Sequence, residues 1–284
     1  MKICDLHTHS DFSDGTCTPH ELVREAADKG ICAIALTDHN TVDGLPSFLA
    51  ETEKAGVEGV GGVELSCDFE GGEIHLLALF LEERHYDSIR ELCRELAHNK
   101  EESNRILVSR LIEDGYDIDD IDTIYRKSVH GNVNRAHIAE ALMRGGYVTS
   151  VKEAFLGILS VERGYFVPPE RIDPIQAVKL IRSMGAVSII AHPYLNMTQE
   201  KLERFLSVGV EAGLHGMETY YPEYDRATHI LARETARRFG LAESGGSDYH
   251  GTRKKERSLS SENGFYAPYE LYEKLLSIKN RKSR

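Results

Sequence analysis

Hydrophobic and polar positions alternate along the chain in blocks that predict an α/β arrangement. Short, continuous apolar runs are typical of buried strands, and longer amphipathic stretches are typical of surface helices. In the first third of the chain we expect strands at 2–6, 31–36, 57–65 (ending at Glu64) and 74–81, and helices at 20–29 and 45–55. After residue 160 we expect strands at 186–191, 216–221, 241–246 and 264–267, and helices at 174–184, 199–208, 224–239 and from 268 onward. This order predicts a sheet flanked by helices.

Residues 86–159 interrupt this rhythm with a helical and heavily charged pattern. Apolar residues recur there at steps of three and four, and we expect no strand. The pattern predicts an α/β body formed by residues 1–84 and 160–284 and an all-helical insertion at 85–159. Within the insertion, Asn132, Arg135 and His137 lie where a loop enters a helix, a position that favours anions. Taken alone, this segment fits an ordinary helix start with an exposed arginine better.

Imidazole and carboxylate side chains lie at or near the ends of the expected strands. The first fifteen residues hold Asp5, His7, His9 and Asp14, and an extended backbone would place both imidazoles on one face. The others are His39, Glu64, His75, His192, Asp248 and His250. Each could singly be a capping residue or a satisfied buried group. Chance would not place nearly all of them at the ends of different strands, where α/β proteins build their sites.

The chemistry of this set predicts a hydrolytic metal centre. It contains histidines and carboxylates but no cysteine, which suits Mn, Fe or Zn in a reactive site better than a closed structural zinc site. The set is larger than one or two ions need and suits three if Glu64 bridges them. Adjacent ions can share a hydroxide, lower its pKa and hold both the attacking and the leaving oxygen of a phosphoryl group.

Composition excludes several other classes of protein. A chain of 284 residues suits a single barrel, and we expect no membrane span because it has no apolar run of about 18 residues. Five scattered cysteines without a CxxC motif fit the reducing cytoplasm. A formal net charge of −12 argues against a basic surface for long nucleic acid. We expect the RKKER segment, residues 253–257, to be a solvated loop.

Six segments carry a family resemblance: DLHTHSDFSDG, TDHNTVDG, GVELS, EIHLLAL, AHP and GGSDYHG, in this order. Together they resemble the polymerase-and-histidinol-phosphatase (PHP) superfamily over essentially the whole chain. The segments NVNRAHIAEAL and GMETYYPEYDRATHILARETARRFGL are similar to a narrower branch. Its members are stand-alone phosphoesterases that act on nucleoside 3′,5′-bisphosphates, some of them on RNA 5′ ends. The resemblance implies a distorted (β/α)7 barrel, the PHP fold, with a trinuclear site that the helical insertion caps.

The resemblance also implies roles for individual residues. The first metal would be held by His7, His9, Glu64 and Asp248, the second by Asp14, His39 and His250, and the third by Glu64, His75 and His192. Arg135, with help from Asn132 and His137, would face the substrate phosphate. The catalytic residues would be Asp248, His192 and His250, with one of the two histidines protonating the leaving oxygen.

Three positions differ from residues that are common in other members of the superfamily and help to indicate the branch that the chain resembles. Asn40 and Ala78 stand where many members have Asp and Gly, which affects substrate detail more than the metal site. Asp14 stands where other branches have His, which points away from a histidinol phosphatase.

The predicted function is therefore that of a cytoplasmic phosphoric ester hydrolase with three divalent ions (Mn, Fe or Zn). A metal-bridging hydroxide would remove the 3′-phosphate of nucleoside 3′,5′-bisphosphates, for example giving AMP and phosphate. We expect a small phosphorylated partner, a nucleotide or short RNA end, and no long nucleic acid, membrane or obligate protein partner. The alternatives are a 5′→3′ exoribonuclease on short RNA ends, a histidinol-phosphate phosphatase and a non-catalytic, metal-stabilised module.

Overall fold

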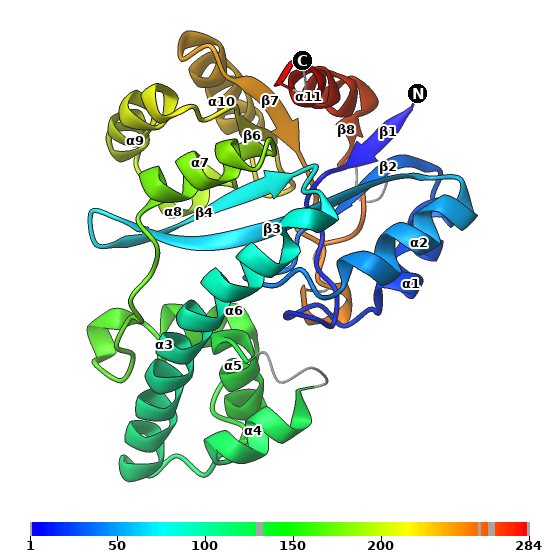
Figure 1. The fold of residues 1–284 in the computed structure, drawn as a ribbon. Helices are drawn as coiled ribbons and strands as arrows, with labels where there is room; N and C mark the ends of the chain where they lie inside the picture. The colour runs from blue at the N-terminus through cyan, green and yellow to red at the C-terminus, as the bar shows by residue number, and fades with distance from the viewer. Residues whose placement is uncertain (1, 129–132, 255–256, 261–264, 283–284) are drawn as a thin grey trace.

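An eight-stranded sheet forms the body of the protein (Figure 1). The computed structural model describes residues 2–128, 133–254, 257–260 and 265–282. The order of strands across the sheet is β7-β6-β5-β4-β3-β2-β1-β8. Their bounds are β1 (Ile3–Asp5), β2 (Ile31–Leu36), β3 (Glu58–Phe69), β4 (Gly72–Leu79), β5 (Val187–Ile190), β6 (Gly216–Tyr220), β7 (Ala242–Gly245) and β8 (Ala267–Pro268).

The sheet curls into a nearly closed barrel. Strands β1 to β3 are parallel, as are β5 to β7, while β4 runs antiparallel to β3 and β5, and β8 runs antiparallel to β1. Leu6 N donates to Gly245 O (3.1 Å) and Asp248 N donates to His7 O (2.8 Å), so the segments after β1 and β7 meet. The expected α/β, barrel-like fold is confirmed. The count of seven units stays a prediction, since eight strands lie in the sheet and β8 has two residues.

Helices pack on both faces of the sheet, because strand residues alternate between two apolar clusters. One cluster lies under α1, α2, α7, α9 and α10, and the other includes Leu6, Ala35, Leu77 and Ile189 and faces α11. The side chain of Thr18 begins α1 in a capping box with Glu21. The bounds are α1 (Pro19–Asp28), α2 (Leu45–Ala55), α7 (Pro174–Ser183), α8 (Pro193–Asn196), α9 (Gln199–Ala212), α10 (Arg226–Arg238) and α11 (Tyr269–Lys282).

The middle of the chain forms a helical layer that lies below the sheet in Figure 1. It comprises α3 (Tyr86–Glu113), α4 (Ile121–Lys127), α5 (Arg135–Arg144) and α6 (Val151–Leu156). These helices share a third apolar cluster, from Leu107 to Phe166, that is separate from the other two. The helical character expected of this stretch is confirmed over its described residues. Its boundaries as a domain, 85–159, stay a prediction.

One expected strand end is wrong. Strand β3 continues past Leu65 to Phe69, because the antiparallel pairing with β4 extends to Phe69 and Gly72. Glu70 and Gly71 connect the two strands, both with positive φ (51° and 71°). Glu64 therefore lies inside a strand rather than at its end. Gly264, the expected start of the last strand, lies outside the described residues, and β8 begins at Ala267.

Candidate metal centre

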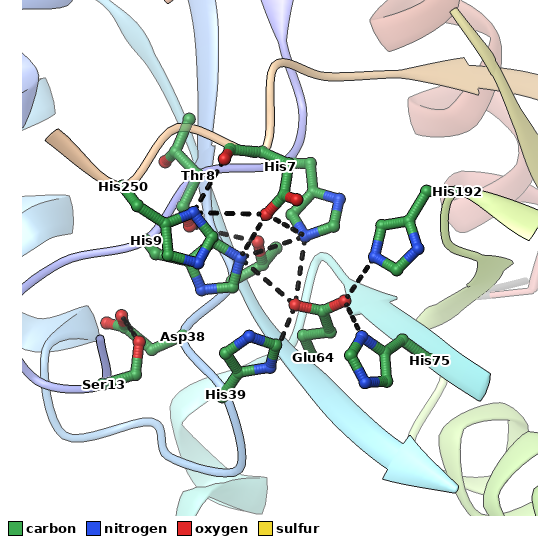
Figure 2. Close-up of polar contacts among 12 residues, drawn as sticks. His7, Thr8, His9, Ser13, Asp38, His39, Glu64, His75, His192 and His250 are labelled. Carbon is green, nitrogen blue, oxygen red and sulfur yellow. Dashed lines mark hydrogen bonds and ion pairs between the residues drawn. The ribbon is translucent and has the colours of Figure 1, made fainter. Parts of the chain in front are cut away.

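All of the expected metal-binding side chains except Asp5 converge at one end of the barrel (Figure 2). This end is where β1, β2, β5 and β7 have their carboxyl ends, so the residues that follow these strands meet there. Glu64 comes from the interior of β3. His75 lies near the amino end of β4, and because β4 is antiparallel to its neighbours, that end faces the same way.

The first group of ligand atoms has the spacing of a single coordination shell. His7 Nε2 and His9 Nε2 lie 3.1 Å apart, and each lies 3.1 Å from Glu64 Oε2. Asp248 Oδ1 lies 3.1 Å from His9 Nε2 and 3.6 Å from His7 Nε2. Ligand atoms about 2.1 Å from a shared ion are separated by about 3.0–3.4 Å in octahedral or tetrahedral geometry. The four side chains fit one divalent ion.

The second group surrounds Asp14. Its Oδ1 lies 3.2 Å from His250 Nε2, 3.8 Å from His39 Nε2 and 3.9 Å from His9 Nδ1. Since His9 Nε2 belongs to the first group, this imidazole lies between the two groups and offers one nitrogen to each.

The third group lies around the other oxygen of Glu64. Glu64 Oε1 lies 2.7 Å from His75 Nδ1 and 3.1 Å from His192 Nε2. His39 is near enough to Glu64 and His75 to join this group, although its Nδ1 lies 3.1 Å from Oε2, the oxygen that also faces the first group. Glu64 thus occupies the centre of the cluster, as a bridging carboxylate would.

Ionisation of the two carboxylates Glu64 and Asp14 and of two of the histidines suits metal binding. Burial alone would raise the pKa of Glu64 and of Asp14, but the surrounding imidazoles hold both pKa values well below the usual range. Burial lowers the pKa of His39 to about 3 and that of His250 to about 4, so both rings are neutral at pH 7.

Neighbouring carboxylates, acting against burial, raise the pKa of His9 to about 9 and that of His75 to about 10. These two rings would release a proton on binding metal, because neutral imidazoles and ionised carboxylates are the forms that bind metals. In addition, His192 Nδ1 is buried without a hydrogen-bond partner among the described residues.

Two buried aspartates shape the backbone of the site instead of joining it. Asp5, a ligand candidate from the sequence, accepts hydrogen bonds from Ser247 N (2.8 Å) and Ser260 N (2.9 Å) and belongs to none of the metal-binding groups. Asp38 accepts from Ser10 N (2.7 Å) and from the hydroxyls of Ser10 and Ser13 (2.6 Å each). Asp5 therefore ties β1 to the segments after β7, and Asp38 fixes the loop that carries His9 and Asp14.

Sequence reasoning missed the residues that support the ligands. Glu218 Oε1 lies 3.0 Å from His7 Nδ1, and its Oε2 accepts a hydrogen bond from His192 N (2.6 Å). Tyr221 donates its hydroxyl proton to Asp248 Oδ2 (2.9 Å). The sequence held one signal for Glu218: it is an acidic residue inside the apolar segment GMETYY. A buried carboxylate without a partner is costly there, so it indicates a partner in the site.

The expectation of a solvated loop at residues 253–257 is wrong for its described members. Lys254 Nζ lies 3.4 Å from Asp248 Oδ2 and 3.2 Å from His250 Nε2. Arg257 bonds to Asp248 as well. Arg253 Nε donates to Glu140 Oε1 of α5 (2.6 Å). Carboxylates of the site and of α5 draw these cations inward, because buried or partly buried charges need partners.

Arg135, one of the residues expected at the substrate, lies near the metal centre, and its role in substrate binding stays a prediction. Arg135 Nη2 donates to Glu73 Oε2 (3.3 Å), and its guanidinium lies 4.0 Å from the ring centroid of Phe166. Arg171, which the sequence did not single out, donates to the same oxygen (2.8 Å). Glu73 Oε1 in turn lies 3.3 Å from His75 Nε2, so this arginine pair lies beside the metal centre.

The other two expected substrate residues are less informative. Asn134 N donates to His137 Nδ1 (3.1 Å), which makes His137 part of the capping box that begins α5. Asn132 lies outside the described residues. A role for either in substrate binding stays a prediction.

Comparison with known proteins identifies the family. The family model described as PHP domain matches residues 5–166 of the chain. The chain belongs to the PHP family. Proteins of this family that resemble it are named as phosphatases, phosphodiesterases and exoribonucleases, so the chain is a phosphoester hydrolase, as the sequence predicted. The His/Asp/Glu groups of the site support its dependence on divalent metal.

Three PHP relatives differ in the substrate that their names state. A phosphoribosyl 1,2-cyclic phosphate 1,2-diphosphodiesterase of Eggerthella lenta is 31% identical, over 87% of this chain and 94% of that protein. A 5′-3′ exoribonuclease of Haemophilus influenzae is 32% identical, over 88% and 90%. A 3′,5′-nucleoside bisphosphate phosphatase of Chromobacterium violaceum is 27% identical, over 88% and 88%.

The fold of the chain also matches a solved structure. A structure from Bifidobacterium adolescentis superimposes with a TM-score of 0.84 at 23% identity, covering 98% of this chain and 96% of the other. Separately, no helix in the described part of the chain is long and apolar enough to cross a membrane.

Proposed function

We propose that this hydrolase removes the 3′-phosphate of nucleoside 3′,5′-bisphosphates and leaves the nucleoside 5′-monophosphate. The observation that carries the proposal is a cationic group beside the metal centre but outside it. Arg135 and Arg171 share the single carboxylate of Glu73, so the three side chains carry a net positive charge. Guanidinium groups recognise phosphate through paired, charge-assisted hydrogen bonds.

The arginine pair is held rigidly enough to act as a receptor. The side chain of Arg171 is only 8% exposed, and Arg135 packs against the rings of Phe155 and Phe166. Because Glu73 contacts both the pair and His75, the pair stays at a fixed place relative to the metal centre. A substrate with two phosphates on one ribose can present one to the metals and the other to the arginines. Two relatives are named for substrates of that kind, a nucleoside bisphosphate and a phosphoribosyl cyclic phosphate.

The metal centre would hold three divalent ions, Mn, Fe or Zn, in the groups described above. When bound, such ions act as Lewis acids and supply a water that is nucleophilic near neutral pH. Asp248, at the edge of the first group, would help to hold its ion and is itself fixed by Tyr221. The free thiols of all five cysteines support the cytoplasm as the compartment.

The leaving 3′ oxygen needs a proton, and the sequence offers His192 and His250 for this role. His250 uses both ring nitrogens, since Nδ1 donates to Asp248 O (2.7 Å) and Nε2 faces Asp14. His192 uses only Nε2 towards Glu64, and its Nδ1 has no partner within the described ranges. Since His192 Nδ1 is also buried and both rings would hold metal through Nε2, we assign neither histidine as the proton donor.

A 5′→3′ exoribonuclease is the second candidate, and one cavity favours it. A cavity of about 280 Å³ lies between the loop at 11–16 and helices α4 and α5, and Lys127, Arg144 and Arg253 line it. A 5′-phosphorylated dinucleotide differs from a bisphosphate only in the nucleoside esterified to the reacting phosphate. This cavity, beside the loop that carries Asp14, could hold that extra nucleoside.

Phosphate release from adenosine 3′,5′-bisphosphate tests the proposal. Wild-type protein reconstituted with Mn²⁺ should release phosphate and AMP, while chelated protein and Asp248→Ala should not. A 5′-phosphorylated dinucleotide, assayed in parallel, separates the two candidates: preference for it by more than about tenfold in kcat/KM would favour the exoribonuclease. Full metal content without hydrolysis of either substrate would refute both.

A further inference from the structure

Glu218 is a buried acid of the site that belongs to none of its three metal-binding groups. It lies on β6, its side chain is 0% exposed, and each carboxylate oxygen has one partner. Oε1 lies 3.0 Å from His7 Nδ1, and Oε2 lies 2.6 Å from the main-chain N of His192. The two partners belong to different groups of ligands, since His7 is in the first and His192 in the third.

Both partners of Glu218 are donors. The main-chain N–H of His192 can only donate. His7 Nε2 lies among the ligand atoms of the first group, where it would offer its lone pair to the ion, so the ring proton is on Nδ1, facing Glu218. A carboxylate accepts at both oxygens, whereas an amide of the same shape accepts at one and donates at the other. A glutamate is therefore the side chain of this shape that satisfies both partners.

The backbone at His192 needs such a partner. His192 has φ 28° and ψ 51°, in the left-handed region that non-glycine residues rarely adopt, and Pro193 follows it. The bond from His192 N to Glu218 holds this conformation, which turns the imidazole towards Glu64. On the other side, the hydrogen bond to Nδ1 fixes the tautomer and the orientation of the His7 ring.

We propose that Glu218 is a positioning residue that couples the first and third metal-binding groups. It holds the His7 ring and the His192 backbone at one spacing, so that both imidazoles reach opposite oxygens of Glu64. The inference rests on the metal assignment of the proposed function but not on its substrate. Loss of Glu218 should therefore weaken metal binding at two groups at once.

The test is Mn²⁺ binding to Glu218→Gln, measured by titration calorimetry and by metal content after gel filtration. Loss of such a supporting contact lowers metal affinity by about 10–100-fold, and we expect that loss together with a reduced stoichiometry. Glu243→Gln is the matched control, because Glu243 lies on the neighbouring strand β7 and pairs with Arg233 away from the site. The control should bind Mn²⁺ as the wild type does.

Two further measurements keep the result interpretable. A merely structural role would lower the unfolding temperature of chelated and loaded protein equally and leave the Kd for Mn²⁺ unchanged. Glu218→Asp, which keeps two acceptors on a shorter arm, serves if the glutamine variant does not fold, and it should show an intermediate loss. Wild-type Kd and stoichiometry in either folded variant would overturn the proposal. Because the probe is Mn²⁺ alone, a wrong choice of substrate would leave this outcome unaffected.

Discussion

At the scale of single residues, the site is built on strained backbone that its own contacts hold in place. Asp248 has φ 52° and His192 has φ 28°, conformations that cost about 1–3 kcal/mol each for non-glycine residues. Asp248 N donates to His7 O, and the turn directs Oδ1 to His9 while Oδ2 faces Tyr221. The strain therefore aims each carboxylate oxygen at a different partner.

The arginine pair gives a prediction at the same scale. Arg135→Ala and Arg171→Ala should each raise KM for adenosine 3′,5′-bisphosphate about tenfold or more, since a hydrogen bond to a charged group contributes about 1.5–3 kcal/mol. Neither should change KM for a small aryl phosphate much, because that substrate has no second phosphate. Steady-state kinetics on both substrates measure the difference.

Arg105→Ala is the control for this comparison. Arg105 is an exposed arginine of α3 that pairs with Glu101 and Asp122, away from the metal centre. It should leave both KM values unchanged. Equal effects of Arg135→Ala on the two substrates would remove the pair from the recognition of a second phosphate.

At the scale of elements, the local apolar pattern predicted the doubly buried strand β2 correctly. It did not predict the full length of β3, which forms a hairpin with β4. Strand β2 and helix α2 coincide with their predicted bounds, because β2 is a continuous apolar run, and α2 has a proline in its first turn and ends at the left-handed Gly56. The extension of β3 over Ser66 to Phe69 could not be predicted, because its polar residues gain strand structure from pairing with β4. Pairing between strands is a tertiary effect that one segment does not encode.

The candidate site likewise contains residues that the sequence predicted and residues that it did not. Ligands such as His39 and His192 follow strands, so topology alone brings them together. Their supports come from distant positions: Glu218 lies 211 residues from His7, and Arg171 lies 98 residues from Glu73. No local signal joins such pairs, and only the closed sheet does.

The start of α5 gives a prediction with a defined pH window. Burial, and after it the nearby charge of Arg253, lowers the pKa of His137 from 6.5 to about 4. The ring is therefore neutral at pH 7, and its Nδ1 accepts the Asn134 N–H. The unfolded chain then binds the proton more readily, so His137 should lower the stability as the pH falls from about 6.5 towards 4. Urea unfolding at pH 8, 6 and 5 measures this contribution.

His137→Gln isolates the effect. Glutamine at this capping position still accepts the Asn134 N–H but does not titrate. The difference in unfolding free energy between variant and wild type should shift in favour of the variant between pH 8 and pH 5. A difference that is independent of pH would show that His137 does not lose its capping bond on protonation.

At the scale of the whole molecule, charge is distributed unevenly. The chain carries a formal net charge of −12, yet cations gather around the metal centre on two sides. Arg135 and Arg171 lie beside His75, and Lys254 and Arg257 lie beside Asp248. Such a local field attracts a phosphorylated substrate to the site while the rest of the surface repels long polyanions.

Metal removal should destabilise the whole fold, because the centre joins β3, β4 and the segments after β1, β2, β5 and β7 in one cluster. Ions that bind only the folded state add about 2.7 kcal/mol for each site at a free concentration of 100 times Kd. At about 2 °C per kcal/mol for a chain of this size, each ion should raise Tm by about 5 °C. Calorimetric unfolding of chelated protein during titration with Mn²⁺ should show this rise, and Asp248→Ala should show a smaller one because one group of ligands is incomplete. A Tm that does not respond to Mn²⁺ in the wild type would contradict the binding of Mn²⁺ at this cluster.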